Sequence, residues 1–261
     1  MASEQQPAKK MDDVSAPQPS QAAAKGPKPS ESKRMRMQHD VAGAFSTPRP
    51  AMAIGSRIYA ATMTSAAAEK LPDSLSLRIQ SITEAWPEAD KNSFDLVHQR
   101  TGLYTIGAGL RAAVTGLAGL VKPGGWIQIV DADLTGPEAD ADSPLGPAVH
   151  LIKSLLGKRL DNSDAYGATL KHILEENGFV GVQEQIFDAR IGAMNPNAEL
   201  AEKGTMSYVL ATEGMAAAVK SKGGEKWSSF DPVAMVSALK QGLEEKGALC
   251  RYWVVWGQKP L

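Results

Sequence analysis

From about residue 57 to the C-terminus, apolar and polar residues follow the periods of strands and helices. Short apolar or alternating runs predict strands, since successive side chains of a strand point to opposite faces. Leu and Val at helical spacing predict helices. The predicted strands span residues 57–62, 75–82, 94–100, 126–130, 180–192 and 251–260. The predicted helices span residues 110–121, 164–177, 200–218 and 231–246.

Residues that typically cap helices or form turns support these boundaries. The run Lys122-Pro123-Gly124-Gly125 predicts a helix end and a turn, because proline and paired glycines interrupt helices. Asp164 predicts an N-cap, and Asp231 followed by Pro232 predicts another helix start. Strands that alternate with helices predict an α/β fold with a mainly parallel sheet covered on both faces. Ligands of such folds bind beyond the carboxyl ends of the strands.

Two regions differ in composition. Residues 1–38 are rich in Pro, Ser, Gln, Lys and Ala, so they cannot bury enough apolar surface to offset the entropy of ordering. We therefore predict a disordered N-terminal extension over 1–38 and a folded domain over 39–261. Lys33, Arg34 and Arg36 form a small basic cluster, which is either a weak nuclear address or a solvated surface.

Charge and composition exclude several classes of function. The net charge of −1 gives no field to attract nucleic acid or acidic lipid, and no apolar run reaches the roughly 20 residues that cross a membrane. Cys250 is the only cysteine, and the four histidines have no metal-ligand spacing. We expect a cytoplasmic protein with no metal, acting on a small molecule; a homo-oligomer stays open.

Several of these segments resemble a known family. Residues 92–100 (NSFDLVHQR) and 120–134 (LVKPGGWIQIVDADL) resemble the fourth and fifth strands of class I S-adenosylmethionine (SAM) methyltransferases. The likeness is strongest to the fungal secondary-metabolism branch with the LaeA-like and UMTA-like enzymes. Residues 71–88 resemble the third strand, 170–193 the late helix and sixth strand, and 252–260 the closing strand. The resemblance implies a Rossmann-like sheet, mostly parallel, with an antiparallel last strand.

The resemblance also identifies where the cofactor site departs from the family. The family begins with a strand and a turn of the form D-x-G-x-G-x-G, whose nearest counterpart here keeps only Asp40 and Gly43. The acidic residue that ends the family's second strand corresponds to Thr62, 22 positions after Asp40. The N-terminal part of the fold is therefore truncated or degenerate. SAM, the implied cofactor, is expected to bind weakly or not at all.

Other cofactor contacts follow from the same alignment. Ser81 and Ile82 match the positions near the adenine, where many family members carry an acid or a small polar residue. Gln99 and Arg100 lie where the fourth strand reaches its loop, so they are candidates for the methionine end of the cofactor.

Two residues are candidates for acid–base catalysis. His98 ends a predicted strand, and its ordinary pKa of about 6.5 suits a general base. The alternative for His98 is a core histidine bonded to the backbone. Asp133 follows the next strand and is the second candidate; its alternative is a residue that caps the loop.

A competing motif lies in the middle of the chain. Gly107-Ala108-Gly109 begins a G-x-G-x-x-A string, and Asp131 follows 24 residues after Gly107. This pattern is typical of a dinucleotide site, but residues 101–105 are a poor strand and the motif alone is weak.

The sequence leaves three functions open. The first is methylation of an oxygen or nitrogen of a small molecule in fungal secondary metabolism. The second is a SAM-independent cyclase or pericyclase, with a polyketide-derived substrate, on the same fold. The third is a non-catalytic interaction protein. One structural question accompanies them: residues 35–42 fill the central slot of the sheet as a short strand, or residues 57–62 pair directly with residues 94–98. We favour the first arrangement, since the Asp40–Thr62 spacing survives.

Overall fold

The computed structural model describes residues 58–62, 75–140, 142–156, 166–222 and 230–261. The predicted extension at 1–38 and the predicted cap Asp164 lie outside these residues. The strands are β1 (Ile58–Thr62), β2 (Leu75–Ile79), β3 (Phe94–Arg100), β4 (Val121–Ala132), β5 (Val180–Ile191) and β6 (Ala248–Gln258). The helices are α2 (Leu110–Leu120), α3 (Gly146–Leu156), α4 (Tyr166–Glu176), α5 (Ala198–Lys222) and α6 (Pro232–Glu245).

The larger sheet has the strand order β3-β4-β6-β5. β3 pairs with β4 in parallel, and β6 runs antiparallel to both β4 and β5. β3, β4 and β5 therefore share one direction, and only the last strand of the chain opposes them. This topology confirms the predicted α/β Rossmann-like fold with an antiparallel last strand.

The second sheet consists of β1 and β2, paired in parallel from Ile58 opposite Leu75 to Thr62 opposite Ile79. Within the described strands, β1 does not pair with β3, so the direct pairing of residues 57–62 with 94–98 is not found. Residues 35–42 lie outside the described part of the chain. The central strand that we favoured there stays a prediction.

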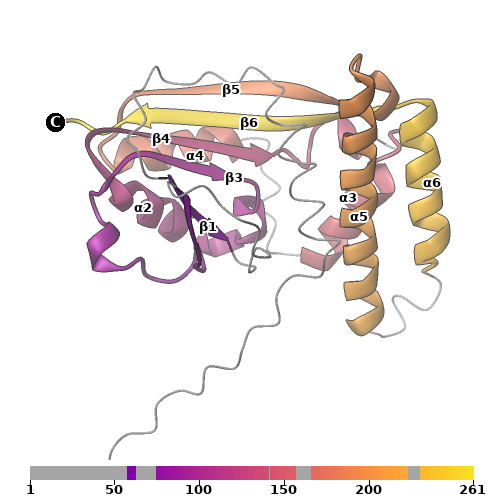
Figure 1. The fold of residues 1–261 in the computed structure, drawn as a ribbon, viewed down its shortest axis with the longest axis horizontal. Helices are drawn as coiled ribbons and strands as arrows, with labels where there is room; N and C mark the ends of the chain where they lie inside the picture. Colours follow the sequence, from indigo (N-terminus) through magenta and orange to yellow (C-terminus); the bar gives the residue numbers. More distant parts are fainter. Residues whose placement is uncertain (1–57, 63–74, 141, 157–165, 223–229) are drawn as a thin grey trace, which may run out of the picture.

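Helices cover both faces of the larger sheet, as alternation along the strands requires. On one face Ile127, Ile129 and Val255 pack with α2 and α4. On the other face Val130 and Val254 pack with α3, α5 and α6. Figure 1 shows α3, α5 and α6 gathered at the end of the sheet toward which β3 and β4 run. These three helices therefore enclose the carboxyl ends of the strands.

Several element boundaries differ from the predictions; β6, for example, begins at Ala248 instead of Arg251, and α5 extends over Ala198–Lys222 instead of 200–218. β4 begins at Val121 instead of Trp126, so residues predicted as a turn belong to the strand. Gly124, with φ of 76°, donates its N–H to Lys259 O, and Lys259 donates back to Gly125 O. The register is irregular between Phe94 and Leu96 at this point, which is typical of a bulge. β2 ends at Ile79, three residues earlier than predicted.

The start of α6 confirms its prediction. Pro232 occupies the first turn, and the carboxylate of Asp231 accepts hydrogen bonds from Val233 N–H and Ala234 N–H. Among the described helices, none has the length and apolar character needed to cross a membrane. The described His, Cys, Asp and Glu residues form no group of three or more that could hold a metal ion.

Candidate functional site

A cavity of about 590 Å³ lies beyond the carboxyl ends of β3 and β4. Thr101 and Gly102 line it directly after β3, and Ala132 lines it at the end of β4. Apolar side chains from α3 and α5 form much of its wall: Ala148, Val149, Ile152, Leu155, Ala211 and Met215. Its volume lies in the range of small-molecule sites, and its position is the one expected for a ligand of this fold.

The loop that follows β3 is fixed by Asp131, a fully buried residue of β4. Gly102 N–H donates to Asp131 Oδ1 over 3.1 Å, and Tyr104 N–H donates to Asp131 Oδ2 over 3.0 Å. Thr101 has φ of 55°, a left-handed conformation that a β-branched residue adopts only where its surroundings impose it. Asp131 therefore holds the backbone that forms this side of the cavity.

Glu138 is the one carboxyl among the described residues that line the cavity. It lies in the short 3-10 turn Pro137–Ala139 and is 1% exposed. Its Oε2 accepts a hydrogen bond from Arg251 N–H over 3.1 Å, while its Oε1 has no partner in the described structure. Burial raises its pKa to about 7; the charge of Asp133 adds to the rise, and backbone N–H donors with the Arg251 charge oppose it.

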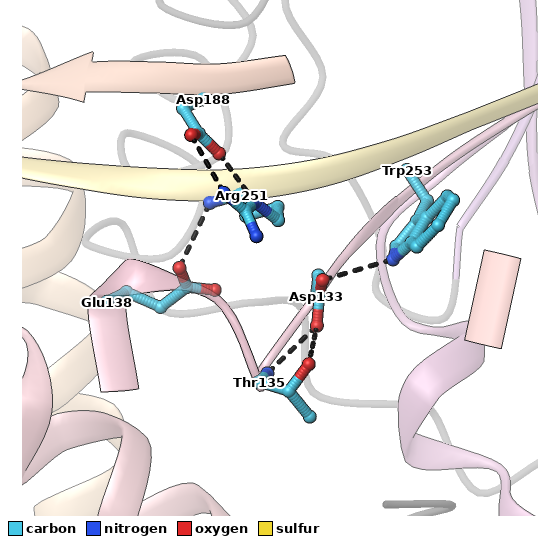
Figure 2. A network of polar contacts seen from close by, with 6 residues as sticks. All are labelled: Asp133, Thr135, Glu138, Asp188, Arg251 and Trp253. Atoms are coloured by element: carbon cyan, nitrogen blue, oxygen red, sulfur yellow. Dashed lines mark hydrogen bonds and ion pairs between the residues drawn. The ribbon is translucent and has the colours of Figure 1, made fainter. Parts of the chain in front are cut away.

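The backbone at Gly136 lets Glu138 approach β6. A Cβ at this position would lie 2.5 Å from Arg251 Cβ and 2.7 Å from Glu138 Oε2. The Arg251 guanidinium points away from Glu138 and binds Asp188 on β5, with Nε–Oδ1 at 2.8 Å and Nη2–Oδ2 at 3.0 Å (Figure 2). Arg251 thus links the β5–β6 pair to the turn that carries Glu138.

Three other polar groups of the cavity bond to one another. The Tyr208 hydroxyl donates to Cys250 Sγ over 2.8 Å and lies 3.3 Å from the Tyr252 hydroxyl. Tyr252 stacks on Phe187 with ring centroids 5.3 Å apart. Burial raises the pKa of Cys250 to about 12 and the pKa values of both tyrosines well above their ordinary value. These groups are therefore neutral near pH 7.

Thr212 on α5 is fully buried and also lines the cavity. Within the described coordinates its Oγ1 has no hydrogen-bond partner. Buried polar atoms are nearly always satisfied, so each exception requires an explanation. Glu138 Oε1 and Thr212 Oγ1 are two such exceptions among the residues that line one cavity.

The two predicted catalytic residues lie outside the described lining of this cavity. His98 is exposed, and its Nδ1 lies 3.0 Å from Gln128 Oε1. Asp133 accepts from Thr135 N–H at 2.9 Å, from the Thr135 hydroxyl at 2.5 Å and from Trp253 Nε1–H at 3.1 Å (Figure 2). Both carboxylate oxygens of Asp133 are therefore engaged in holding the loop.

The structure describes only some of the predicted cofactor residues. Gln99 Nε2 donates to Thr101 O over 2.9 Å, and Arg100, half-buried at the end of β3, has its pKa lowered by burial. Ser81 and Ile82 follow β2; Ser81 Oγ lies 2.9 Å from Thr83 Oγ1, and Ile82 packs on the core cluster that includes residues of α2 and α4. Asp40 and Gly43 lie outside the described residues, and Thr62 ends β1. All seven stay predictions.

The dinucleotide interpretation does not fit the local structure. Residues Leu103–Thr105 and Gly107–Gly109 form 3-10 turns that lead into α2. A dinucleotide fingerprint needs a strand before its first glycine. Asp131, the acid of that pattern, binds backbone N–H groups of the loop after β3.

Sequence reasoning missed Glu138 and Thr212. Asp131 and Asp133 come directly after the predicted strand, so Asp133 was predicted as a catalytic residue. Glu138, the next acidic residue along the chain, was not. The Gly136-Pro137 pair before Glu138 was the available signal, since it marks a turn that folds back on the sheet. Thr212 carries no sequence signal, because it is one polar residue within a long helix.

The chain has clear relatives among fungal proteins, although no family model matches it. It is 32% identical over 199 residues to the N-methyltransferase sirN of Leptosphaeria maculans, covering 72% of this chain and 67% of the relative. It is 32% identical over 201 residues to the N-methyltransferase gliN of Aspergillus fumigatus, covering 73% and 70%.

Among solved structures it is similar to phosphoethanolamine N-methyltransferase 2 of Haemonchus contortus, with a TM-score of 0.40 and 15% identity. That match covers 72% of this chain and 38% of the other, so this chain spans little more than a third of its length. Because the similarity is this low, we draw no conclusion about function from this structure and rely on the two fungal relatives.

Proposed function

Because the chain belongs to the fungal SAM-dependent methyltransferases, we propose that it transfers a methyl group from SAM to a nitrogen of a small molecule bound in the cavity. The observation that carries this proposal is the Glu138 carboxyl, buried at the cavity with one oxygen lacking a partner in the described structure. The relatives whose names specify N-methylation support nitrogen as the acceptor.

Glu138 is proposed as the proton acceptor in place of Asp133 and His98. A general base must reach the substrate and hold a pKa near the working pH. Glu138 lines the cavity, and its pKa is raised to about 7. Asp133 is hydrogen-bonded to Thr135 and Trp253, and His98 is hydrogen-bonded to Gln128. Neither residue belongs to the described lining of the cavity.

SAM, when bound, would supply a methyl group on a sulfonium sulfur: the nitrogen lone pair would form a bond to the methyl carbon as the C–S bond breaks, and S-adenosylhomocysteine would leave. The chain's own residues then have three tasks. The apolar wall of α3 and α5 holds the substrate and excludes water. The loop fixed by Asp131 keeps Thr101 and Gly102 at one side of the cavity. Glu138 Oε1 takes the proton that the nitrogen releases.

The described part of the cofactor site fits the methionine end of SAM. Thr101 and Gly102 line the cavity and follow Arg100, which lies outside the described lining and whose guanidinium suits the carboxylate of SAM. The ribose end fits less well, since Thr62 replaces an acid and the glycine turn is reduced to Asp40 and Gly43. Losing such charge-assisted hydrogen bonds costs about 1.5–3 kcal/mol each, so we propose that SAM binds with a dissociation constant above roughly 0.1 mM.

Calorimetric titration of the full chain with SAM tests this function. We expect saturable binding of one SAM per chain in the range of about 0.1 mM to a few mM. No saturable binding over that range would contradict methyl transfer and favour the cyclase or the non-catalytic interaction protein. A low-micromolar dissociation constant would keep methyl transfer and overturn the weak binding that we propose.

The biological setting is proposed from the same resemblance. The fungal secondary-metabolism branch carries the motifs shared by residues 92–100 and 120–134, so we place the substrate among the small molecules of that metabolism. An apolar cavity with few polar groups suits such a molecule, and does not suit a protein or a nucleic acid as the methyl acceptor.

A further inference from the structure

The described lining of the cavity contains one acidic side chain and no basic side chain. The described lining residues include Glu138 and no Lys, Arg or His. A carboxylate or phosphate on the ligand would therefore enter an apolar site without a cation to bind it, and would face Glu138. An ammonium group would meet an opposite charge. The cavity thus discriminates against anions before any specific contact is made.

Two atoms on different elements of the cavity wall need a partner. Glu138 Oε1 comes from the turn after β4, and Thr212 Oγ1 comes from α5. Neither is satisfied by the other, and both side chains are buried to 1% exposure or less. A ligand that reaches both walls would satisfy the two atoms at once, and this defines two points of recognition.

The other polar side chains of the described lining, Tyr104 among them, have contacts within the protein. Tyr208, Tyr252 and Cys250 bond within their own cluster. Thr105 donates its hydroxyl to Gly102 O over 2.6 Å, and Thr101 donates its hydroxyl to Arg100 O over 2.8 Å. These contacts bind the lining together, so Glu138 and Thr212 are left to orient the ligand.

We propose that the cavity binds an apolar primary or secondary amine as its cation, with an amine N–H donating to Glu138 Oε1 and a second polar group of the same molecule bonding to the Thr212 hydroxyl. Only the identification of this amine as the methyl acceptor rests on the proposed function. A bound ammonium ion must lose a proton before its nitrogen can attack. Glu138 is the base within reach of that proton, so recognition and activation would use the same oxygen.

Three indole probes of matched size test the proposal in the absence of SAM: tryptamine, indole-3-propionate and indole-3-propanamide. They share the apolar ring and its N–H, and they end in a cation, an anion and a neutral amide. Calorimetric titration of the full chain at pH 8 is expected to give tryptamine an affinity at least about tenfold above that of the propionate. Equal binding of the two, or tighter binding of the propionate, would overturn the proposal.

Two variants assign the recognition points. Glu138→Gln is expected to weaken tryptamine about tenfold or more and to leave the propanamide within about threefold, since only the charge is removed. Thr212→Val is expected to weaken both by about three- to tenfold, and Thr212→Ser, which keeps the hydroxyl, is expected to restore them. Unchanged tryptamine affinity in Glu138→Gln would overturn the proposal. The comparison of probes on the unmodified chain decides the question even where a variant fails to fold.

The outcome separates this proposal from methyl transfer. If the chain binds the amine selectively but does not bind SAM, the proposed amine site is supported and the proposed methyl transfer is refuted. Saturable SAM binding by a chain that does not select the amine would keep the methyltransferase and refute the amine site.

Discussion

The backbone N–H of Arg251 donates to one carboxylate oxygen of Glu138 over 3.1 Å, while the other oxygen has no hydrogen-bond partner in the described structure. The two residues are 113 positions apart, and they meet because the turn at Gly136 folds back against β6. The contact fixes the position of Glu138 without neutralising it through the Arg251 side chain, which is engaged with Asp188. Figure 2 shows that the backbone N–H of Arg251 binds Glu138 and its guanidinium binds Asp188.

Gly136→Ala tests whether this close approach positions Glu138. The added Cβ would lie 2.5 Å from Arg251 Cβ, so the turn must shift and carry Glu138 with it. We expect a loss of about 1–3 kcal/mol in the free energy of unfolding and about a tenfold loss in tryptamine affinity. Urea unfolding and calorimetry measure the two effects.

Gly119→Ala in α2 is the matched control, since a Cβ there would meet no atom within 4 Å. Because alanine favours a helix over glycine by up to about 1 kcal/mol, we expect equal or greater stability and unchanged affinity. Wild-type tryptamine affinity in Gly136→Ala would show that the approach at Gly136 is not needed to place Glu138.

The raised pKa of Glu138 predicts a pH-dependent stability. The carboxyl has an ordinary pKa of 4.5 and a folded pKa of about 7, so the folded chain holds its proton more tightly than the unfolded chain. Stability from this group is complete below pH 4.5 and is lost as the pH rises through 7. Relative to Glu138→Gln, the wild type should lose on the order of 3 kcal/mol across this window, because each pKa unit is worth about 1.4 kcal/mol.

Urea unfolding of both chains between pH 4.5 and 8 measures this difference. The groups that face Glu138 are Asp133, whose charge raises the pKa, and Arg251, whose charge and N–H lower it. Glu184→Gln, the same change at an exposed position of β5, controls for the loss of one carboxyl group. A difference between wild type and Glu138→Gln that stays constant over the whole range would rule out the raised pKa.

Asp133→Asn separates the two candidate acids. Each oxygen of Asp133 accepts from a donor, so the amide NH₂ of asparagine would face Thr135 or Trp253 Nε1–H. We expect a loss of about 1–3 kcal/mol in the free energy of unfolding, with tryptamine affinity within about threefold of wild type. If a folded Asp133→Asn instead lost methyl transfer by about 100-fold, Asp133 would be the acid–base residue that the sequence predicts.

The sequence was sufficient where local signals agree. Strand Phe94–Arg100 was predicted to the residue, because the polar turn before it and the alternation within it are both local. The start of α6 was confirmed for the same reason, since Asp231 and Pro232 act only on the first turn.

The sequence was insufficient where a feature depends on distant residues. Lys122–Gly125 was predicted as a turn, yet these residues belong to β4, because Gly124 and Gly125 pair with Lys259 near the end of the chain. Glu138 becomes a site residue only through its contact with Arg251 and through its place in a cavity that residues of α3 and α5 also line. No local pattern encodes either contact, so the general fold was predictable and the proposed base was not.

The most direct measurement is methyl transfer itself. The full chain is incubated at pH 8 with several-millimolar SAM labelled on the methyl group and with tryptamine, and the label on the amine is counted. We expect N-methylated tryptamine from the wild type and a kcat lower by about 100-fold or more in Glu138→Gln, with the KM for SAM unchanged. Equal kcat in the two chains, or no labelled amine while SAM and tryptamine are both bound, would contradict the account.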